Sequence, residues 1–305
     1  MHRPTVDVVV PFKGSPQALN ALRERLSVLS LRPGDSVVVV DNTPRDEPLA
    51  GEDGGASILH ADALPTPAFA RNAGVARGSG EWLVFCDADT AAPADLLDRY
   101  FDPPPAPRTG LIGGGVIDEP APEDAPAVAR YTHIRGVMSQ EATFDFGDRW
   151  GYPKTANVAC RRTAFEEVGG FREDIRAAED ADLTYRMRAA AWEVERREDA
   201  AVVHASRTTL RGLVVQQLLW GSGGAWVDRM YPGAVPLVGK SGFLRWAATT
   251  TLGGLVTAAR LRNRDTALIA LLRPVEALAW ELGRLLPNER PVPDSSPWKR
   301  LRLLR

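Results

Sequence analysis

The sequence of 305 residues is 44% hydrophobic and 25% charged, which excludes a disordered or fibrous chain and predicts a globular protein with a large core. The formal net charge of −2 gives no reason to expect a nucleic-acid partner. The charge-free run Trp246–Ala259 is shorter than the roughly 20 residues that a membrane-spanning helix needs, so surface helices are expected there.

The beginning of the chain and its two cysteines indicate a compartment. The first residues show no charged-then-apolar leader, and Cys86 and Cys160 both lie in apolar runs. Small buried hydrophobic side chains are the expected role of these thiols, which favours a reducing environment. We therefore expect a cytoplasmic protein.

The first 117 residues alternate apolar runs with helical spacing. Buried strands are predicted at Val6–Phe12, Ser36–Val40, Ser57–His60, Trp82–Cys86 and Gly110–Ile117. Helices are predicted after Pro16, where leucines recur at helical spacing, and over Pro67–Ala76. This alternation predicts the α/β fold class, with a mostly parallel sheet between two layers of helices in a three-layer α/β/α sandwich.

The later part of the chain continues this pattern and then becomes helical. The predicted elements are a strand over Thr155–Arg162, a short helix over Thr163–Val168, a helix opening at Glu179, and two strand-like stretches, Trp192–Arg197 and Ala200–His204. A helical pattern begins at Leu210 and is expected to be interrupted at Gly221–Gly224. Amphipathic helices are expected between Lys240 and Leu286.

Two carboxylates, Asp87 and Asp89, directly follow the apolar run Trp82–Cys86. Because side chains alternate along an extended chain, both point the same way at the carboxyl end of a strand, where open α/β sheets bind ligands. Two like charges there need a cation, and oxygen ligands select a hard ion that commonly bridges carboxylates to nucleotide phosphates. The pattern therefore predicts a Mg²⁺ or Mn²⁺ site, with a solvated loop as the alternative.

Four segments, in this order, resemble the inverting family-2 glycosyltransferases of the GT-A fold: Val8–Phe12, Val39–Asn42, Ala70–Gly74 with Phe85–Asp89, and Glu179–Leu183. The resemblance spans about residues 6–235 and includes Asn157 and the turn Gly169–Phe171. It implies a GT-A sandwich that moves a sugar from a nucleoside-diphosphate sugar to an acceptor hydroxyl with inversion.

The resemblance also implies roles for residues near the strand ends. Asp89 would bind the metal, and Asp87 would face the metal or the ribose. Nucleotide-sugar contacts are implied for a wider set, namely Pro11, Phe12, Asp41, Arg71, Asp87 and Asn157. His204, at a predicted strand end, stands where some GT-A enzymes supply a third metal or phosphate contact, and a structural histidine is the alternative.

An acceptor hydroxyl must lose its proton as it attacks the anomeric carbon, so a carboxylate within hydrogen-bond reach is needed. The resemblance assigns this role to Asp180, with Glu179 as the other candidate. An acidic first turn that only complements the helix dipole is the alternative.

The resemblance has one departure, which narrows the expected product. Family-2 enzymes that build polymers often carry Gln-x-x-Arg-Trp, whereas Gln216–Trp220 lacks the arginine. Transfer of a single sugar is therefore expected, in cell-envelope glycan, glycolipid or secondary-metabolite biosynthesis.

Other classes fit the sequence less well. A haloacid-dehalogenase phosphatase would need a threonine where Ala91 stands, and a sugar-nucleotide pyrophosphorylase would need a Gly-rich, Arg-containing loop in place of Lys13–Pro16. A catalytically silent nucleotide-binding scaffold is the non-enzymatic alternative. Such a scaffold would not need both the pair Asp87 and Asp89 and the pair Glu179 and Asp180.

We expect three regions: a nucleotide-sugar-binding half over residues 1–117, an acceptor-binding half over 118–235, and a basic helical region over 236–305. Residues 240–305 carry 12 positive and 5 negative side chains, while residues 1–239 carry 25 and 34. One hypothesis is that the basic region docks on an anionic membrane beside a lipid-linked acceptor. Packing on the catalytic domain, or dimer formation, is the other.

Overall fold

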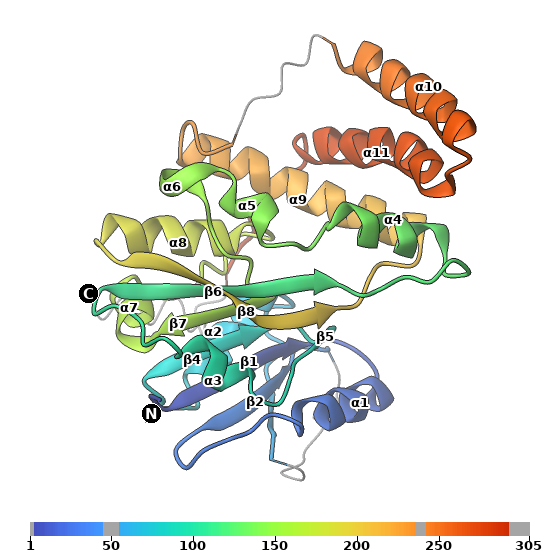
Figure 1. Ribbon diagram of the computed structural model, residues 1–305. Coiled ribbons are helices and arrows are strands. Elements are labelled where there is room, and N and C mark those ends of the chain that lie inside the picture. Colours follow the sequence, from blue (N-terminus) through green and yellow to red (C-terminus); the bar gives the residue numbers. More distant parts are fainter. Residues whose placement is uncertain (1–2, 45–54, 236–241, 293–305) are drawn as a thin grey trace.

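The computed structural model describes residues 3–44, 55–235 and 242–292 (Figure 1). One sheet forms its centre, with the strand order β3-β2-β1-β4-β7-β6-β8-β5. The strands are β1 (Val6–Phe12), β2 (Ser36–Asp41), β3 (Ser57–His60), β4 (Trp82–Cys86), β5 (Thr90–Ala91), β6 (Thr109–Asp118), β7 (Asn157–Arg161) and β8 (Glu193–His204). Strands β7 and β5 run against the others, so the sheet is mixed but mostly parallel, as predicted.

Helices cover both faces of the sheet, because its central strands are apolar on both sides. Val8 and Val10 of β1 pack with α1 (Pro16–Leu26) and α3 (Leu96–Tyr100), whereas Val9 packs with α2 (Pro67–Val75), α7 (Arg162–Glu167) and α8 (Glu179–Ala189). Alternate residues of one strand therefore enter two separate cores. The predicted three-layer sandwich is confirmed, and Cys86 and Cys160 are buried free thiols within it.

A second group of helices lies beyond one edge of the sandwich (Figure 1). It contains α4 (Ala127–Arg135), α5 (Glu141–Phe144), α6 (Gly147–Trp150), α9 (Leu210–Met230), α10 (Phe243–Leu261) and α11 (Arg264–Gly283). Helix α11 packs between α9 and α10 and also contacts α4. The expected C-terminal helices are therefore present. Within the described ranges, no helix is both long enough and apolar enough to cross a bilayer.

Two local predictions for the chain after residue 190 are wrong. The stretches Trp192–Arg197 and Ala200–His204 belong to one strand, β8, whose pairing with β6 shifts register where β8 passes from Arg197 to Val202. Gly221–Gly224 does not interrupt a helix, because α9 runs through it. A Cβ atom on Gly221 would lie 2.0 Å from the carbonyl oxygen of Trp280 in α11, so this glycine permits close helix packing.

Candidate active site

A cleft of about 930 Å³ lies at the carboxyl ends of the central strands. On the side of the sheet it is lined by the predicted residues Pro11, Phe12, Arg71, Asp87, Asp89, Glu179 and Asp180. The opposite wall comes from α9 and α11, through Gln217, Trp220, Gly224, Glu276 and Trp280. The C-terminal helices therefore complete the cleft, although the sequence pattern gave them no place in it.

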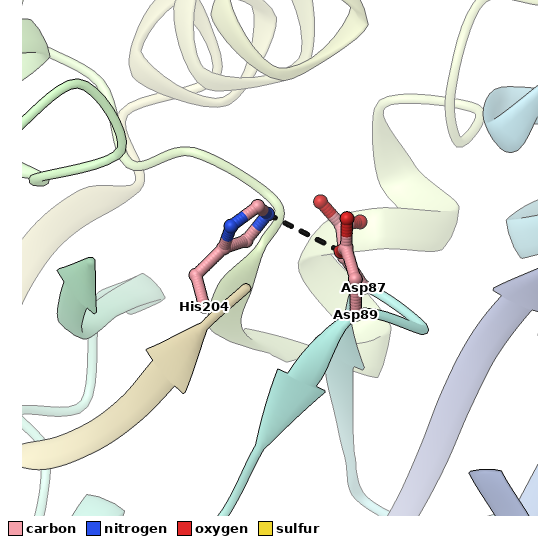
Figure 2. Close-up of side chains that lie close together, drawn as sticks. All are labelled: Asp87, Asp89 and His204. Carbon is pink, nitrogen blue, oxygen red and sulfur yellow. Dashed lines mark ion pairs between the residues drawn. The ribbon is translucent and has the colours of Figure 1, made fainter. Parts of the chain in front are cut away.

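The predicted metal ligands come together at one end of β4 (Figure 2). One ligand atom from each of Asp87, Asp89 and His204 lies within 4.8 Å of the others. His204 reaches this place because β5 pairs with the end of β8, which sets Thr90 opposite His204. The backbone N–H of Ala205 also donates to the carbonyl oxygen of Asp89, at 2.8 Å. Long-range strand pairing, rather than local sequence, thus builds the cluster.

The donor set of this cluster fits a divalent cation. It offers carboxylate oxygens and one imidazole nitrogen, ligands that Mn²⁺ accepts and that Mg²⁺ accepts in part. His204 is only 2% exposed, and in the described parts of the chain its buried Nδ1 has no hydrogen-bond partner. A purely structural histidine would normally have both nitrogens satisfied, so the ring suits a site that gains a further polar partner.

Asp89 and His204 form an ion pair in the structure. His204 Nε2 lies 3.2 Å from Asp89 Oδ1, and Arg207 Nη1 lies 3.1 Å from Asp89 Oδ2. Burial is the largest single effect and opposes the charge on both partners, but their mutual hydrogen bond and the attraction between opposite charges together outweigh it, lowering the pKa of Asp89 and raising that of His204. A cation that binds here would replace these two positive groups as the counter-charge of Asp89.

Arg71 links the metal cluster to the first turn of α8. Its guanidinium donates to Asp87 Oδ1 at 2.7 Å and to Glu179 Oε1 at 2.9 Å, and the side chain is almost fully buried. Helix α2 holds it in place, starting at Pro67 with Thr66 as its N-cap. Glu179 is therefore committed to an ion pair, which makes it the weaker candidate for a general base.

Asp180 lines the same cleft with its carboxylate free of any ion pair to a described residue. Its Oδ1 accepts a hydrogen bond from the backbone N–H of Ala181 at 2.8 Å. Burial and then the negative charge of Glu179 raise the pKa of Asp180 to about 7. A carboxylate with this pKa can accept a proton near neutral pH much better than an ordinary aspartate can.

Two residues that were predicted to contact the nucleotide-sugar donor, Asp41 and Asn157, do not line the cleft. Asp41 ends β2 at the correct edge of the sheet, but it is fully buried, and Asn42 lines the cleft instead. Oδ1 of Asp41 accepts a hydrogen bond from the backbone N–H of Thr43 at 3.1 Å. A contact between Asp41 and the base stays a prediction.

Asn157, which the resemblance assigned to the nucleotide-sugar site, is not among the residues that line the cleft. This residue is 0% exposed, and its side-chain amide donates to the carbonyl oxygens of Gly115 at 2.9 Å and Ala200 at 2.7 Å. Its Oδ1 accepts from the hydroxyl of Tyr100 at 2.6 Å. All its hydrogen-bonding capacity is spent on holding β7, β6 and β8 together, so none is left for a ligand.

Replacing Asn157 by alanine should therefore destabilise the fold rather than weaken donor binding. The change removes the hydrogen bonds that Asn157 makes to two buried carbonyls and a buried hydroxyl, and the expected loss is about 2–4 kcal/mol of unfolding free energy. Urea denaturation measures this loss. Unchanged stability together with weaker nucleotide binding would restore the original assignment.

Lys154 is the residue that sequence reasoning missed. It lines the cleft, and its ammonium donates to the carbonyl oxygens of Val137 at 3.0 Å and Ser139 at 2.8 Å. The only local signal was a single lysine between a proline and a threonine, which does not distinguish a cleft residue from a surface one.

A mixed α/β sheet with an acidic cluster and a separate carboxylate in a cleft at its strand ends has the ligand-site geometry of open-sheet α/β proteins. Comparison with solved structures confirms the GT-A fold. The mannosyltransferase PcManGT from Pyrobaculum calidifontis, in complex with GDP-Man and Mn²⁺, has a TM-score of 0.61 at 17% identity, covering 93% of this chain and 88% of that one. GalNAc-T7 with UDP, GalNAc and Mn²⁺ has a TM-score of 0.50 at 14% identity, covering 76% and 52%.

Sequence comparison gives the family. Residues 7–169, more than half of the chain, match the profile of glycosyl transferase family 2, and the chain belongs to this family. The Pre-mycofactocin glycosyltransferase of Mycobacterium tuberculosis is 28% identical over 251 residues, covering 80% of this chain and 52% of that protein. The chain thus spans about half the length of this relative.

A second relative is similar over nearly its whole length. The succinoglycan biosynthesis protein ExoA of Rhizobium meliloti is 26% identical over an alignment 310 residues long. The alignment covers 90% of this chain and 92% of that protein. The resemblance to family 2 that the motifs indicated is confirmed.

Proposed function

We propose that this chain is a metal-dependent glycosyltransferase that moves one sugar from a nucleoside-diphosphate sugar to an acceptor hydroxyl, with inversion. The observation that carries the proposal is that the cluster of Asp87, Asp89 and His204 and the separate carboxylate of Asp180 line one cleft. Family membership and the GDP-Man and Mn²⁺ bound to a protein of the same fold support the donor and the metal.

The donor would lie at the ends of β1 and β4. Pro11 and Phe12 line the cleft there and would contact the nucleobase. Asp87, Asp89 and His204 would hold Mg²⁺ or Mn²⁺, which would neutralise the charge that develops on the departing diphosphate. Arg71 would keep Asp87 in position through its 2.7 Å hydrogen bond.

Asp180 would take the proton of the acceptor hydroxyl as its oxygen forms the new bond to the anomeric carbon. The bond from that carbon to the diphosphate oxygen breaks in the same displacement, and the diphosphate leaves with its electron pair. Attack from the side opposite the leaving group inverts the anomeric centre. The pKa of Asp180, raised to about 7, supports this residue as the base over Glu179, which is paired with Arg71.

The test is a donor screen. The protein is incubated with a panel of nucleotide sugars and either Mn²⁺ or Mg²⁺, and released nucleoside diphosphate is measured. Release with one donor that depends on added metal and is lost in the presence of a chelator is the expected result. No release with any donor would favour the catalytically silent scaffold.

The C-terminal helices support a further part of the proposal, which places the protein in the cytoplasm at the inner face of the membrane. Large apolar side chains are exposed on them, namely Leu244, Leu252, Val256 and Leu261 on α10, and Leu271, Leu278 and Leu282 on α11. Exposed arginines flank them at positions 245, 260, 262, 264 and 273. This combination suits an anionic lipid surface beside a lipid-linked acceptor.

Vesicle sedimentation tests this part. The full chain should sediment with phosphatidylglycerol vesicles, less so at high salt and little with phosphatidylcholine vesicles, because anionic lipids attract the arginines. The double variant Leu252→Glu, Val256→Glu should stay in the supernatant. Equal sedimentation of both proteins would contradict the membrane contact and favour simple packing of these helices on the domain.

A further inference from the structure

The cleft contains positive charge that the donor and the metal do not account for. Arg135, Lys154 and Arg176 all line it, and across residues 3–44, 55–235 and 242–292 none of the three has a carboxylate within 4.0 Å. Of the other cleft cations, Arg71 pairs with two carboxylates and Arg207 with Asp89, while Lys13 and Arg25 lie on the donor side, after β1 and on α1. These three unpaired cations suit an anionic ligand.

Lys154 is the most constrained of the three. Two of its three N–H groups donate to the carbonyl oxygens of Val137 and Ser139, and its ammonium lies 5.7 Å from the centre of the Trp220 ring. Backbone carbonyls and an aromatic face hold the amine in place without neutralising its charge. A third donor therefore remains for a ligand, and no carboxylate of a described residue pairs with the ammonium.

The position of Lys154 relates it to the acceptor rather than to the donor. The carboxylates whose charge acts on Lys154 are those of Asp180 and Asp118, not those of the metal cluster. Trp220 belongs to the wall that α9 and α11 build opposite the sheet. Lys154 thus faces Trp220 of the distal wall in the cleft that Asp180 also lines, and an acceptor on this wall could bring its hydroxyl to Asp180.

Resting on the proposed function, we propose that Lys154 binds an anionic group of the acceptor. The natural acceptor is then a hydroxyl compound that also carries a carboxylate or a phosphate. The anion contacts the ammonium of Lys154, the rest of the molecule lies against Trp220, and the hydroxyl reaches Asp180. Burial lowers the pKa of Lys154 to about 8, so a bound anion would also favour its charged form.

Competitive acetylation tests this proposal without requiring turnover. The chain has only four lysines, Lys13, Lys154, Lys240 and Lys299, so peptide mass spectrometry can follow each one at a pH near 8. Lys13 is the internal control, because it lines the same cleft at the end of β1. UDP or GDP with Mn²⁺ is present throughout to fill the donor site.

Three small probes differ only in the group attached to the hydroxyl-bearing carbons: glycerol, D-glycerate and glycerol 3-phosphate. D-glycerate, glycerol 3-phosphate or both should slow acetylation of Lys154 several-fold more than glycerol does at equal concentration, and none should slow acetylation of Lys13. Protection by only one anion identifies carboxylate or phosphate as the group recognised. Equal protection by glycerol, no protection by either anion, or full protection by the nucleotide and Mn²⁺ alone would overturn the proposal.

A pair of variants supplies the kinetic arm once a donor is known. Lys154→Gln keeps an N–H for the carbonyls of Val137 and Ser139 but loses the charge, and it should raise KM for the anionic acceptor about ten- to hundred-fold while leaving KM for the donor unchanged. Lys13→Gln should not raise KM for the acceptor. If Lys154→Gln leaves the acceptor KM unchanged, Lys154 is only a support for the 137–139 segment.

Discussion

Replacing Asp180 by asparagine is expected to lower kcat by about 10²–10⁴-fold while leaving nucleotide binding intact. Asparagine keeps the size of the side chain and can still accept the hydrogen bond from the N–H of Ala181, but it cannot take a proton. Calorimetric titration with nucleoside diphosphate and Mn²⁺ would check that the donor site is preserved. Turnover close to that of the wild type would remove Asp180 as the base.

The same residue predicts how activity depends on pH. Because a general base must be deprotonated, and the pKa of Asp180 is raised to about 7, kcat/KM should fall as pH drops through 7. An ordinary aspartate would place this fall near its usual pKa of 3.8. A bound cation would move the fall towards lower pH, so kcat/KM is measured at one fixed concentration of Mn²⁺ across the pH range.

The stability of the fold should depend on pH in the opposite direction to activity. Between the unfolded pKa of 3.8 and the folded pKa of about 7, the folded protein binds a proton at Asp180 that the unfolded chain has lost. The free energy of unfolding therefore falls as pH rises through this window. Asp180→Asn should remove this loss and raise the unfolding free energy at pH 8 by on the order of 1–3 kcal/mol. Reduced stability of this variant at pH 8 would show that the charged carboxylate of Asp180 does not destabilise the folded protein.

Asp89→Asn is expected to abolish most metal-dependent activity, lowering kcat/KM by about 10²–10³-fold. The change removes one ligand and its negative charge, and it leaves His204 and Arg207 without the carboxylate they now contact at 3.2 and 3.1 Å. The positive charge of Arg207 would then be left uncompensated beside an incoming cation. Titration with Mn²⁺ in the presence of nucleoside diphosphate should show weakened binding.

The matched control is Asp95→Asn, which removes an exposed carboxylate near the start of α3, outside the cleft. This change should alter neither Mn²⁺ affinity nor turnover, because exposed ion pairs contribute little. A wild-type Mn²⁺ requirement in Asp89→Asn would mean that the cluster of Asp87, Asp89 and His204 is not the metal site.

Much of the fold could be predicted from the sequence, because its signals are local. Val8–Val10 and Val37–Val40 are uninterrupted apolar runs, which is typical of parallel strands buried on both faces. Asp87 and Asp89 end such a run, so their place at the ligand-binding edge follows from strand geometry alone. The order of these motifs was also enough to indicate family 2.

Other features depend on partners far away in the chain. The glycines at 221–224 resemble a helix break, yet the carbonyl of Trp280, about sixty residues later, makes them a packing surface. Asn157 resembles a ligand contact, yet Tyr100, Gly115 and Ala200 use all its hydrogen bonds. Propensity and spacing cannot reveal such contacts, because hydrogen-bond satisfaction and close packing are properties of the assembled structure.

The amino-acid sequence by itself determined most of the strands and the acidic strand end, since each is written in the residue types and spacing of one short segment. The order of four such segments indicated the family and, through it, the candidate base. Only the tertiary structure decided that His204 joins Asp89, through the pairing of β5 with β8, and that α11 closes the cleft. It also placed Lys154 in the cleft that Asp180 lines, with its ammonium held by backbone carbonyls. These features arise when segments distant in sequence are brought together, and the burial that follows sets their charge and their chemistry.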